Sequence, residues 1–106
     1  MTLTRKFHDL VQHRASKNPA VADALLQEAV NAMLAGEVDV GKSLLRDYIN
    51  ATVGFEKLSE ATGTAARSLS HMLGPRGNPG ARGLFGVISH LQRQTGVEVH
   101  VTVGAK

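Results

Sequence analysis

Residues 18–36 carry a complete set of signals for one α-helix. Asn18 can cap the helix with its side chain, Pro19 suits the first helical position, and Gly36 can end the helix. Between them, apolar residues recur at helical spacing. A chain of 106 residues has room for one modest core, so we expect this apolar stripe to lie in it. The stripe comprises Leu25, Leu26, Ala29, Val30 and Met33.

The rest of the chain up to residue 96 also has the pattern of helices separated by glycines. Residues 3–16 place Phe7, Leu10, Val11 and Arg14 at the spacing of one helical face. The whole pattern predicts an all-α protein of five to six helices. Besides the helix after Asn18, the expected helices cover residues 3–16, 39–53, 55–63, 64–74 and 81–96.

The C-terminal segment changes to an alternating period. Val97, Val99, Val101 and Val103 alternate with Glu98, His100 and Thr102, which predicts a short β-strand with one apolar face. A single strand cannot pair its own backbone groups, so it needs an edge from a second copy or another partner. The alternative is a frayed terminus.

Composition excludes several classes of site and location. The chain has no cysteine, which rules out disulfides, zinc–thiolate sites and cysteine nucleophiles. No apolar run approaches membrane-spanning length, and the N-terminal residues lack an apolar signal core. We therefore expect a cytoplasmic protein that makes no membrane contact.

Positive charge is concentrated in the second half of the chain. Between Glu60 and Glu98 there is no acidic residue, whereas this interval holds four arginines and two histidines. Such a basic segment favours a polyanionic partner. The alternative is a cationic surface that only contacts solvent.

Residues 36–43 match the phosphate-loop pattern G-x-x-x-x-G-K-[ST] letter for letter. A working loop follows a β-strand and leads into a helix N-terminus, where backbone N–H groups converge on phosphate. Here the preceding segment is the helix that ends in Gly36, and Gly41, Lys42 and Ser43 fall inside the next helix. With Gly36 as a helix end and Asp39 as an N-cap, we expect no nucleotide binding.

Other sites for chemistry are sparse in this sequence. The histidines are scattered and none pairs with an acid at ligand spacing on one helix face, so we expect no metal or cofactor. Asp39 and Asp47 are interpreted as a cap and a solvated charge rather than an acid–base pair. No serine has the setting of a nucleophile, and we do not expect an enzyme.

Residues 55–73 have the pattern of a helix-turn-helix. Gly63 suits a tight turn, and Ser59 lets the second helix cross closely over the first. The second helix would present Ala66, Arg67, Ser70 and His71 outward, where they could contact base edges. The alternative is a helical hairpin without a DNA role. The residues expected to pack inward are Leu58, Ala61, Leu69, Met72 and Leu73.

The segment that contains this helix-turn-helix pattern resembles a known family. The segment LSEATGTAARSLSHMLGPRGNPGARGLFGVI is similar to the helix-turn-helix antidote proteins of addiction modules, the HigA-like antitoxins of type II toxin–antitoxin systems. Gly77-Asn78-Pro79, at this family's distance after Leu73, is the most specific piece. The resemblance covers residues 38 to about 91.

The resemblance implies a lambda-repressor-like bundle that binds double-stranded DNA in its own promoter as a homodimer and represses transcription. It also implies a cognate partner, a small ribonuclease toxin of the RelE-like class. Alternatives are a stand-alone transcriptional regulator without a toxin and a helical protein-interaction module. Phosphate contacts are expected from Lys57, Arg76, Asn78 and Arg82.

The sequence departs from the family in three places. Ala65 replaces the usual Ser or Thr cap, Ser70 replaces a common Tyr, and glycines follow Pro79. Residues 1–36 form a helical extension beyond the minimal family member. We therefore divide the chain into this extension, a DNA-binding domain over residues 37–96, and a dimerising tail over residues 97–106.

Overall fold

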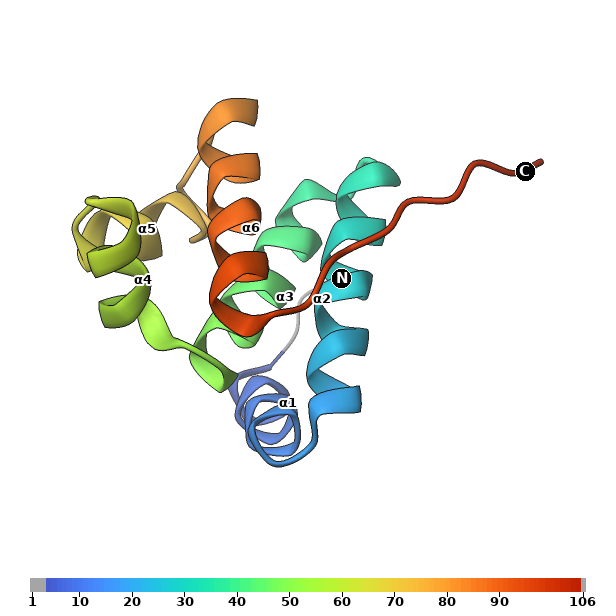
Figure 1. Cartoon of the computed structure of the whole chain (residues 1–106), viewed down its shortest axis with the longest axis horizontal. Helices are drawn as coiled ribbons and strands as arrows, with labels where there is room; N and C mark the ends of the chain where they lie inside the picture. Colours follow the sequence, from blue (N-terminus) through green and yellow to red (C-terminus); the bar gives the residue numbers. More distant parts are fainter. Residues whose placement is uncertain (1–3, 106) are drawn as a thin grey trace.

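The computed structural model describes residues 4–105, and these residues form six helices and no strand. The all-α prediction is therefore confirmed. In chain order the helices are α1 (Arg5–Lys17), α2 (Pro19–Leu34), α3 (Val38–Ala51), α4 (Gly54–Thr62), α5 (Ala66–Met72) and α6 (Ala81–Thr95) (Figure 1).

The predicted signals at the two ends of α2 are confirmed. Asn18 Oδ1 accepts a hydrogen bond from Ala20 N at 3.0 Å, and Pro19 is the first helical residue. Gly36 has a φ of +86°, the left-handed conformation that allows the chain to leave the helix.

The start of α3 differs from the prediction. Asp39 lies in the first turn of α3, and Glu37 occupies the cap position without a side-chain hydrogen bond. The reason is that Glu37 N donates to Ala32 O at 2.9 Å while Glu37 O accepts from Gly41 N at 3.0 Å. One residue thus closes α2 and opens α3, and the helix begins before Asp39.

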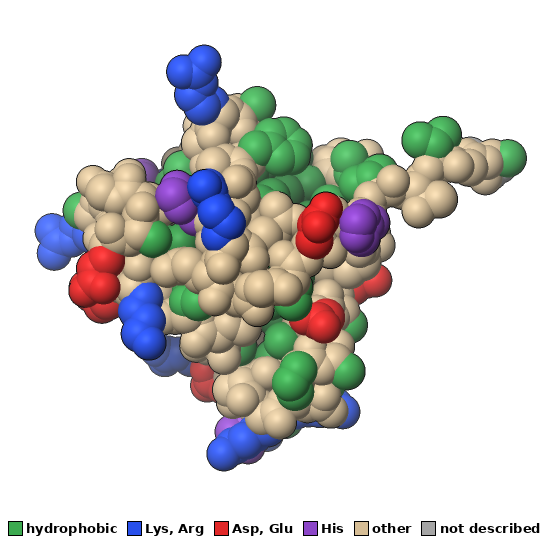
Figure 2. Space-filling model, in the orientation of Figure 1, with side chains coloured by type: hydrophobic (Ala, Val, Ile, Leu, Met, Phe, Trp, Pro, Cys, Tyr) green, Lys and Arg blue, Asp and Glu red, His purple; other side chains and the backbone are tan. Residues whose placement is uncertain are grey.

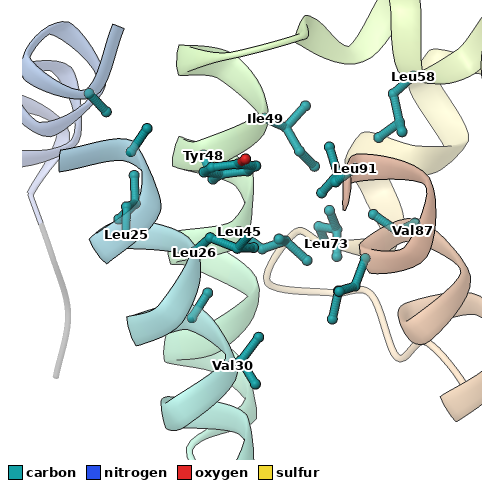
Figure 3. Close-up of a cluster of buried hydrophobic side chains, with 14 of the residues drawn as sticks. Leu25, Leu26, Val30, Leu45, Tyr48, Ile49, Leu58, Leu73, Val87 and Leu91 are labelled. Carbon is teal, nitrogen blue, oxygen red and sulfur yellow. The ribbon is translucent and has the colours of Figure 1, made fainter. Parts of the chain in front are cut away.

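Helix α3 lies at the centre of the core and packs on both sides. Figure 3 shows Leu45, Tyr48 and Ile49 of α3 between two sets of apolar side chains. Apolar burial is the main favourable term in folding. Helix α3 therefore joins the apolar side chains of α2 to those of α4, α5 and α6. On one side lie Ala22, Leu25, Leu26, Ala29 and Val30 of α2; on the other lie Leu58, Leu69, Leu73, Val87, Ile88 and Leu91.

Helices α2 and α3 approach closely at Gly41. A Cβ atom on Gly41 would overlap Met33 Cγ and lie 2.9 Å from the backbone oxygen of Ala29. Because only glycine fits at this distance, the second glycine of the phosphate-loop pattern has a packing role.

The helix predicted over residues 3–16 is present as α1, but most of the face that carries Phe7 and Leu10 lies outside the core. Phe7 and Leu10 are 43% and 56% exposed, whereas Ala15 is buried and Val11 packs partly against the core. The physical reason is a polar contact: His8 and Gln12 of α1 bond to Asp47 of α3. That contact turns the helix so that Phe7 and Leu10 face solvent.

The C-terminal segment after α6 forms no strand within residues 4–105. Val97 and Val99 pack partly against the core, and Val99 N donates to Gln92 Oε1 at 2.7 Å. Val101 and Val103 are 62% and 95% exposed, and this part of the chain leads away from the helices (Figure 1). A single chain offers these residues no strand edge, so the predicted pairing needs a second molecule.

Candidate nucleic-acid interface

Helices α4 and α5 are joined by the short turn of residues 63–65. Gly63 has a φ of +75°, as predicted for this position, and its N–H donates to Ser59 O at 2.9 Å. Thr64 N donates to Thr62 Oγ1 at 3.2 Å. The two helices are therefore held at a tight, hydrogen-bonded corner.

Three leucines pack under this corner, but one predicted core residue does not. Leu58, Leu69 and Leu73 are buried, and Met72 is half-buried. Ala61 was predicted to face inward and is exposed. It lies in the last turn of α4, next to the exposed turn, where no described element covers it.

Helix α5 presents the predicted outward residues. Arg67 and His71 are exposed, and Ala66 and Ser70 are half-buried. Their spacing of three and four residues places them on neighbouring turns of one helical surface. Ala65 at the cap makes no side-chain hydrogen bond, which confirms that α5 begins without a side-chain acceptor.

The side chains of α5 border an open hollow of about 460 Å³, which we call the α3–α5 hollow. It brings three of the four predicted base-reading residues together with Arg76. Its lining includes three arginines and one histidine but no acid, so the local potential is positive. The side chains that line it are Arg46, Arg67, Ser70, His71, Pro75 and Arg76.

The other predicted DNA contacts lie outside the hollow. Lys57, Asn78 and Arg82 are all exposed and do not line it. Arg82 lies in the first turn of α6, and its cap residue Gly80 makes no side-chain hydrogen bond. Basic side chains also lie on the face of the molecule seen in Figure 2. Neither Lys57 nor Arg82 forms an ion pair among residues 4–105.

Lys42 holds the loop between α5 and α6 in place. Its side chain is 4% exposed, and Nζ donates to Gly74 O at 3.1 Å and to Gly77 O at 2.6 Å. Asp39 Oδ1 lies 3.3 Å from the same nitrogen. As predicted, Gly41, Lys42 and Ser43 lie inside a helix, and the lysine of the phosphate-loop pattern binds backbone carbonyls of this chain.

Gly77 fixes the same loop against α5. A Cβ atom on Gly77 would overlap the carbonyl oxygens of His71 and Met72. The loop also closes on itself, because Gly77 N donates to Gly74 O and Gly74 N donates to His71 O, both at 3.0 Å. Arg76 therefore extends from a segment with a defined backbone.

Arg46 of α3 was not predicted as a site residue. It lies one turn after Lys42 and lines the α3–α5 hollow beside Gly74. On its other side it borders α1, near His8 and Asp47. Its Nε is buried and has no hydrogen-bond partner among the described residues. The spacing of Lys42 and Arg46 was visible in the sequence, but only the packing of the loop on α3 gave it meaning.

A second polar cluster joins α1 to α3. Asp47 Oδ2 lies 2.6 Å from His8 Nδ1, and Asp47 Oδ1 accepts from Gln12 Nε2 at 2.7 Å. Asp47 was interpreted as a solvated charge, yet it is 2% exposed. The interpretation was wrong because the partners of Asp47 lie 35 and 39 residues away in the sequence, on another helix.

This cluster also contains a serine. Ser43 Oγ lies 3.4 Å from His8 Nε2, so Ser43, His8 and Asp47 stand in a row. The row resembles a nucleophile with its base, but Ser43 lies inside α3, where the neighbouring N–H groups bond within the helix. Free backbone N–H donors for an oxyanion are therefore missing beside Ser43, and the contacts act as a connection between helices.

Comparisons with protein-family models, curated proteins and solved structures found no match for this chain. Within residues 4–105, no group of three or more His, Asp or Glu side chains is placed to hold a metal ion. No helix in the same range has both the length and the apolar character needed to cross a membrane. The geometry around α5 is therefore the main basis for a functional proposal.

Proposed function

We propose that this protein binds double-stranded DNA through α5 and represses transcription from its own promoter. The observation that carries the proposal is the α3–α5 hollow, where side chains from α3, α5 and the following loop form a basic surface without an acid. Phosphate attraction supplies most of the non-specific affinity for DNA. A short helix that presents exposed polar residues on such a surface suits recognition in a major groove.

The proposal divides the exposed residues into two roles. Arg67 and His71, with Ala66 and Ser70 beside them, contact base edges, since arginine can donate two hydrogen bonds to guanine. Lys57, Arg76, Asn78 and Arg82 contact backbone phosphates and position α5. The uncapped N-terminus of α6 beside Arg82 adds free N–H groups that favour an anion.

We further propose that the protein acts as a homodimer. One short recognition helix contacts few bases, and two copies can bind two half-sites about one helical turn apart. The exposed Val101 and Val103 supply a segment that can pair with the same segment of a second copy. Deletion of residues 97–106 is expected to give a monomer by sedimentation; a deletion variant that remains a dimer would rule out this seam.

The resemblance to HigA-like antitoxins supports a specific biological role, an antitoxin that neutralises a small RelE-like ribonuclease toxin. The exposed apolar side chains of α1, Phe7 and Leu10, are the surface proposed for that partner. Substitution of Leu10 by Asp should abolish toxin binding and leave DNA binding intact. If the variant still captures the toxin, the partner binds elsewhere.

A gel shift with the DNA directly upstream of the gene tests DNA binding, with random DNA as competitor. The expected result is a specific shift whose affinity falls linearly with salt on logarithmic axes. A specific shift without a neighbouring toxin gene would indicate a stand-alone regulator. Absence of any salt-dependent shift, with and without the partner, would favour a protein-interaction module.

A further inference from the structure

We propose that the α3–α5 hollow holds one backbone phosphate of DNA and that Arg46, one of the residues that line it, binds this phosphate. The proposal deepens the DNA-binding function above and rests on it. It adds a residue from α3, outside the α4–α5 pair, to the interface. It also separates one fixed phosphate site from the solvent-exposed phosphate contacts of Lys57, Asn78 and Arg82.

The first argument is the unsatisfied donor of Arg46. Its Nε is buried and has no hydrogen-bond partner within residues 4–105, and Arg46 forms no ion pair there. A buried N–H without a partner costs free energy, which an incoming acceptor recovers once a movement of the Arg46 side chain exposes Nε to it. The planar guanidinium group offers Nε and Nη donors together, a geometry that matches two oxygens of one phosphate.

The second argument is convergence of charge. Arg46 comes from α3, Arg67 and His71 come from α5, and Arg76 comes from the following loop. Four groups that carry or can carry positive charge thus line one hollow of about 460 Å³ that has no acid in its lining. Like charges repel one another, so an anion bound by Arg46 and Arg76 also relieves the repulsion among the four groups.

The third argument is that the hollow is built before the anion arrives. Lys42 lies one turn before Arg46 and binds Gly74 O and Gly77 O, so the loop that carries Arg76 is tied to the helix that carries Arg46. Gly77 packs against the carbonyl oxygens of His71 and Met72 at the C-terminal end of α5, which fixes the same loop to the helix that carries Arg67. Little ordering remains to be done when phosphate binds, which favours affinity.

The source of the phosphate follows from the shape of the site. The hollow opens beside the exposed side chains of Arg67 and His71, so a phosphate seated there belongs to a molecule that continues along α5. A DNA backbone meets this condition. Free inorganic phosphate has the same chemistry and is the probe that isolates the pocket from the rest of the interface.

The first experiment needs no DNA. The ¹H–¹⁵N resonance of Arg46 Nε is followed by NMR while inorganic phosphate is added, with sodium chloride at equal ionic strength as control. Phosphate, but not chloride, should shift this resonance, and Arg76→Gln should reduce the shift. An Arg46 resonance that does not respond, or responds equally to chloride, would contradict the proposed phosphate site.

The second experiment measures DNA affinity of Arg46→Gln, Arg46→Lys and the control Arg14→Gln, whose side chain is exposed on α1. We expect Arg46→Gln to weaken specific and random DNA alike by about tenfold or more, as expected for a hydrogen bond to a charged group. Its salt slope should fall by about one. Arg46→Lys should recover only part of the affinity because lysine lacks Nε. Thermal unfolding of each variant separates lost binding from lost folding.

Ethylation of individual DNA phosphates locates the contact. Wild-type protein should be blocked by ethylation of one particular phosphate per half-site, and Arg46→Gln should be insensitive to that same modification. If the wild type binds DNA but Arg46→Gln behaves as Arg14→Gln does, the inference fails and the DNA-binding proposal stands. If phosphate shifts Arg46 but no DNA binds, the assignment to DNA is overturned and the phosphate belongs to a free ligand.

Discussion

The two halves of the molecule use their polar residues differently. In the half formed by α1 to α3, the buried Asp47 has partners on both oxygens, and its bonds connect α1 to α3. In the half formed by α4 to α6, the basic residues Arg67, Arg76 and Arg82 stay exposed and unpaired within residues 4–105. Paired buried groups define a fold, whereas unpaired exposed cations remain free to bind an anion.

Lys42 lies where the two halves meet. It is buried and paired, as Asp47 is in the first half, and it is basic, as the exposed residues of the second half are. It is a cation of the first half, but the groups it binds are carbonyls of the loop that follows α5. Its position explains how an apolar N-terminal core can support a basic surface on the other side of α3. The predictions below test this division, beginning with the largest expected effect.

Lys42→Met should cause the largest loss of stability. The substitution keeps the aliphatic stem but leaves the Gly77 carbonyl without its donor and the Gly74 carbonyl with Gly77 N alone. An unsatisfied buried group costs about 1–3 kcal/mol, and the lost bond from a charged donor to Gly74 O adds to it. We expect a loss of about 3 kcal/mol in the free energy of unfolding, measured with urea. Lys17→Met, at an exposed lysine of α1, is the control and should change the value by less than about 0.5 kcal/mol. Equal effects of the two variants would show that the loop does not depend on Lys42.

Gly77→Ala should destabilise by about 2 kcal/mol, because the new methyl group overlaps backbone carbonyls that cannot move without bending α5. Gly80→Ala is a matched control in the same loop, since nothing lies within 4 Å of a Cβ there. Denaturant unfolding gives the stability, and a gel shift of the folded fraction tests whether the distorted loop also impairs DNA binding. A Gly77→Ala variant as stable as Gly80→Ala would contradict the close packing.

Arg67→Ala and Arg82→Ala should separate the two kinds of DNA contact. Arg67→Ala is expected to cost about 1–3 kcal/mol on the specific site and to relax base preference, with a smaller loss on random DNA. Arg82→Ala should weaken all sequences alike. The measurement is a competition gel shift with specific and random duplexes. If both variants lose affinity equally on both duplexes, the proposed division of roles is wrong.

The smallest effect concerns Tyr48, the only tyrosine in the chain. Burial raises the pKa of its phenol above the usual 10.0, the charge of Asp23 raises it further, and a hydrogen bond with Thr95 partly lowers it. Because the folded pKa lies above the unfolded one, this contribution to stability is complete below pH 10 and is lost as pH rises through the folded pKa.

Titration of tyrosinate absorbance should therefore show a higher pKa in the folded protein than in urea. Tyr48→Phe should flatten the dependence of unfolding free energy on pH above 10. A folded titration that coincides with the unfolded one would show that solvent reaches this phenol. Such a result would break the picture of a closed N-terminal half.

Local sequence was sufficient for most of the secondary structure. Asn18, Pro19 and Gly36 act within a few residues of themselves, and each has the predicted role. Gly63 and the missing cap at Ala65 were predicted for the same reason. Where prediction failed, at Phe7, Leu10 and Ala61, the question was which face of a helix is covered, and a helical pattern alone does not say what covers it.

The candidate site was predicted in part. The α5 residues follow from helical spacing, and Arg76 follows from its place in the loop. Arg46 could not be assigned because it reaches the hollow only when the loop after α5 packs on α3. Residues 97–103 show the reverse case. Their alternating valines are clear in the sequence, but a strand forms only against an edge that one chain does not provide.

The sequence by itself determined the helices, their ends and the basic character of residues 61–97, because these depend on neighbours within a turn or two. Only the tertiary structure decided which charges are buried and partnered. Lys42 meets its carbonyls across 32 and 35 residues, and Asp47 meets His8 across 39. Such contacts depend on how helices pack, and in water each side chain alone would remain solvated.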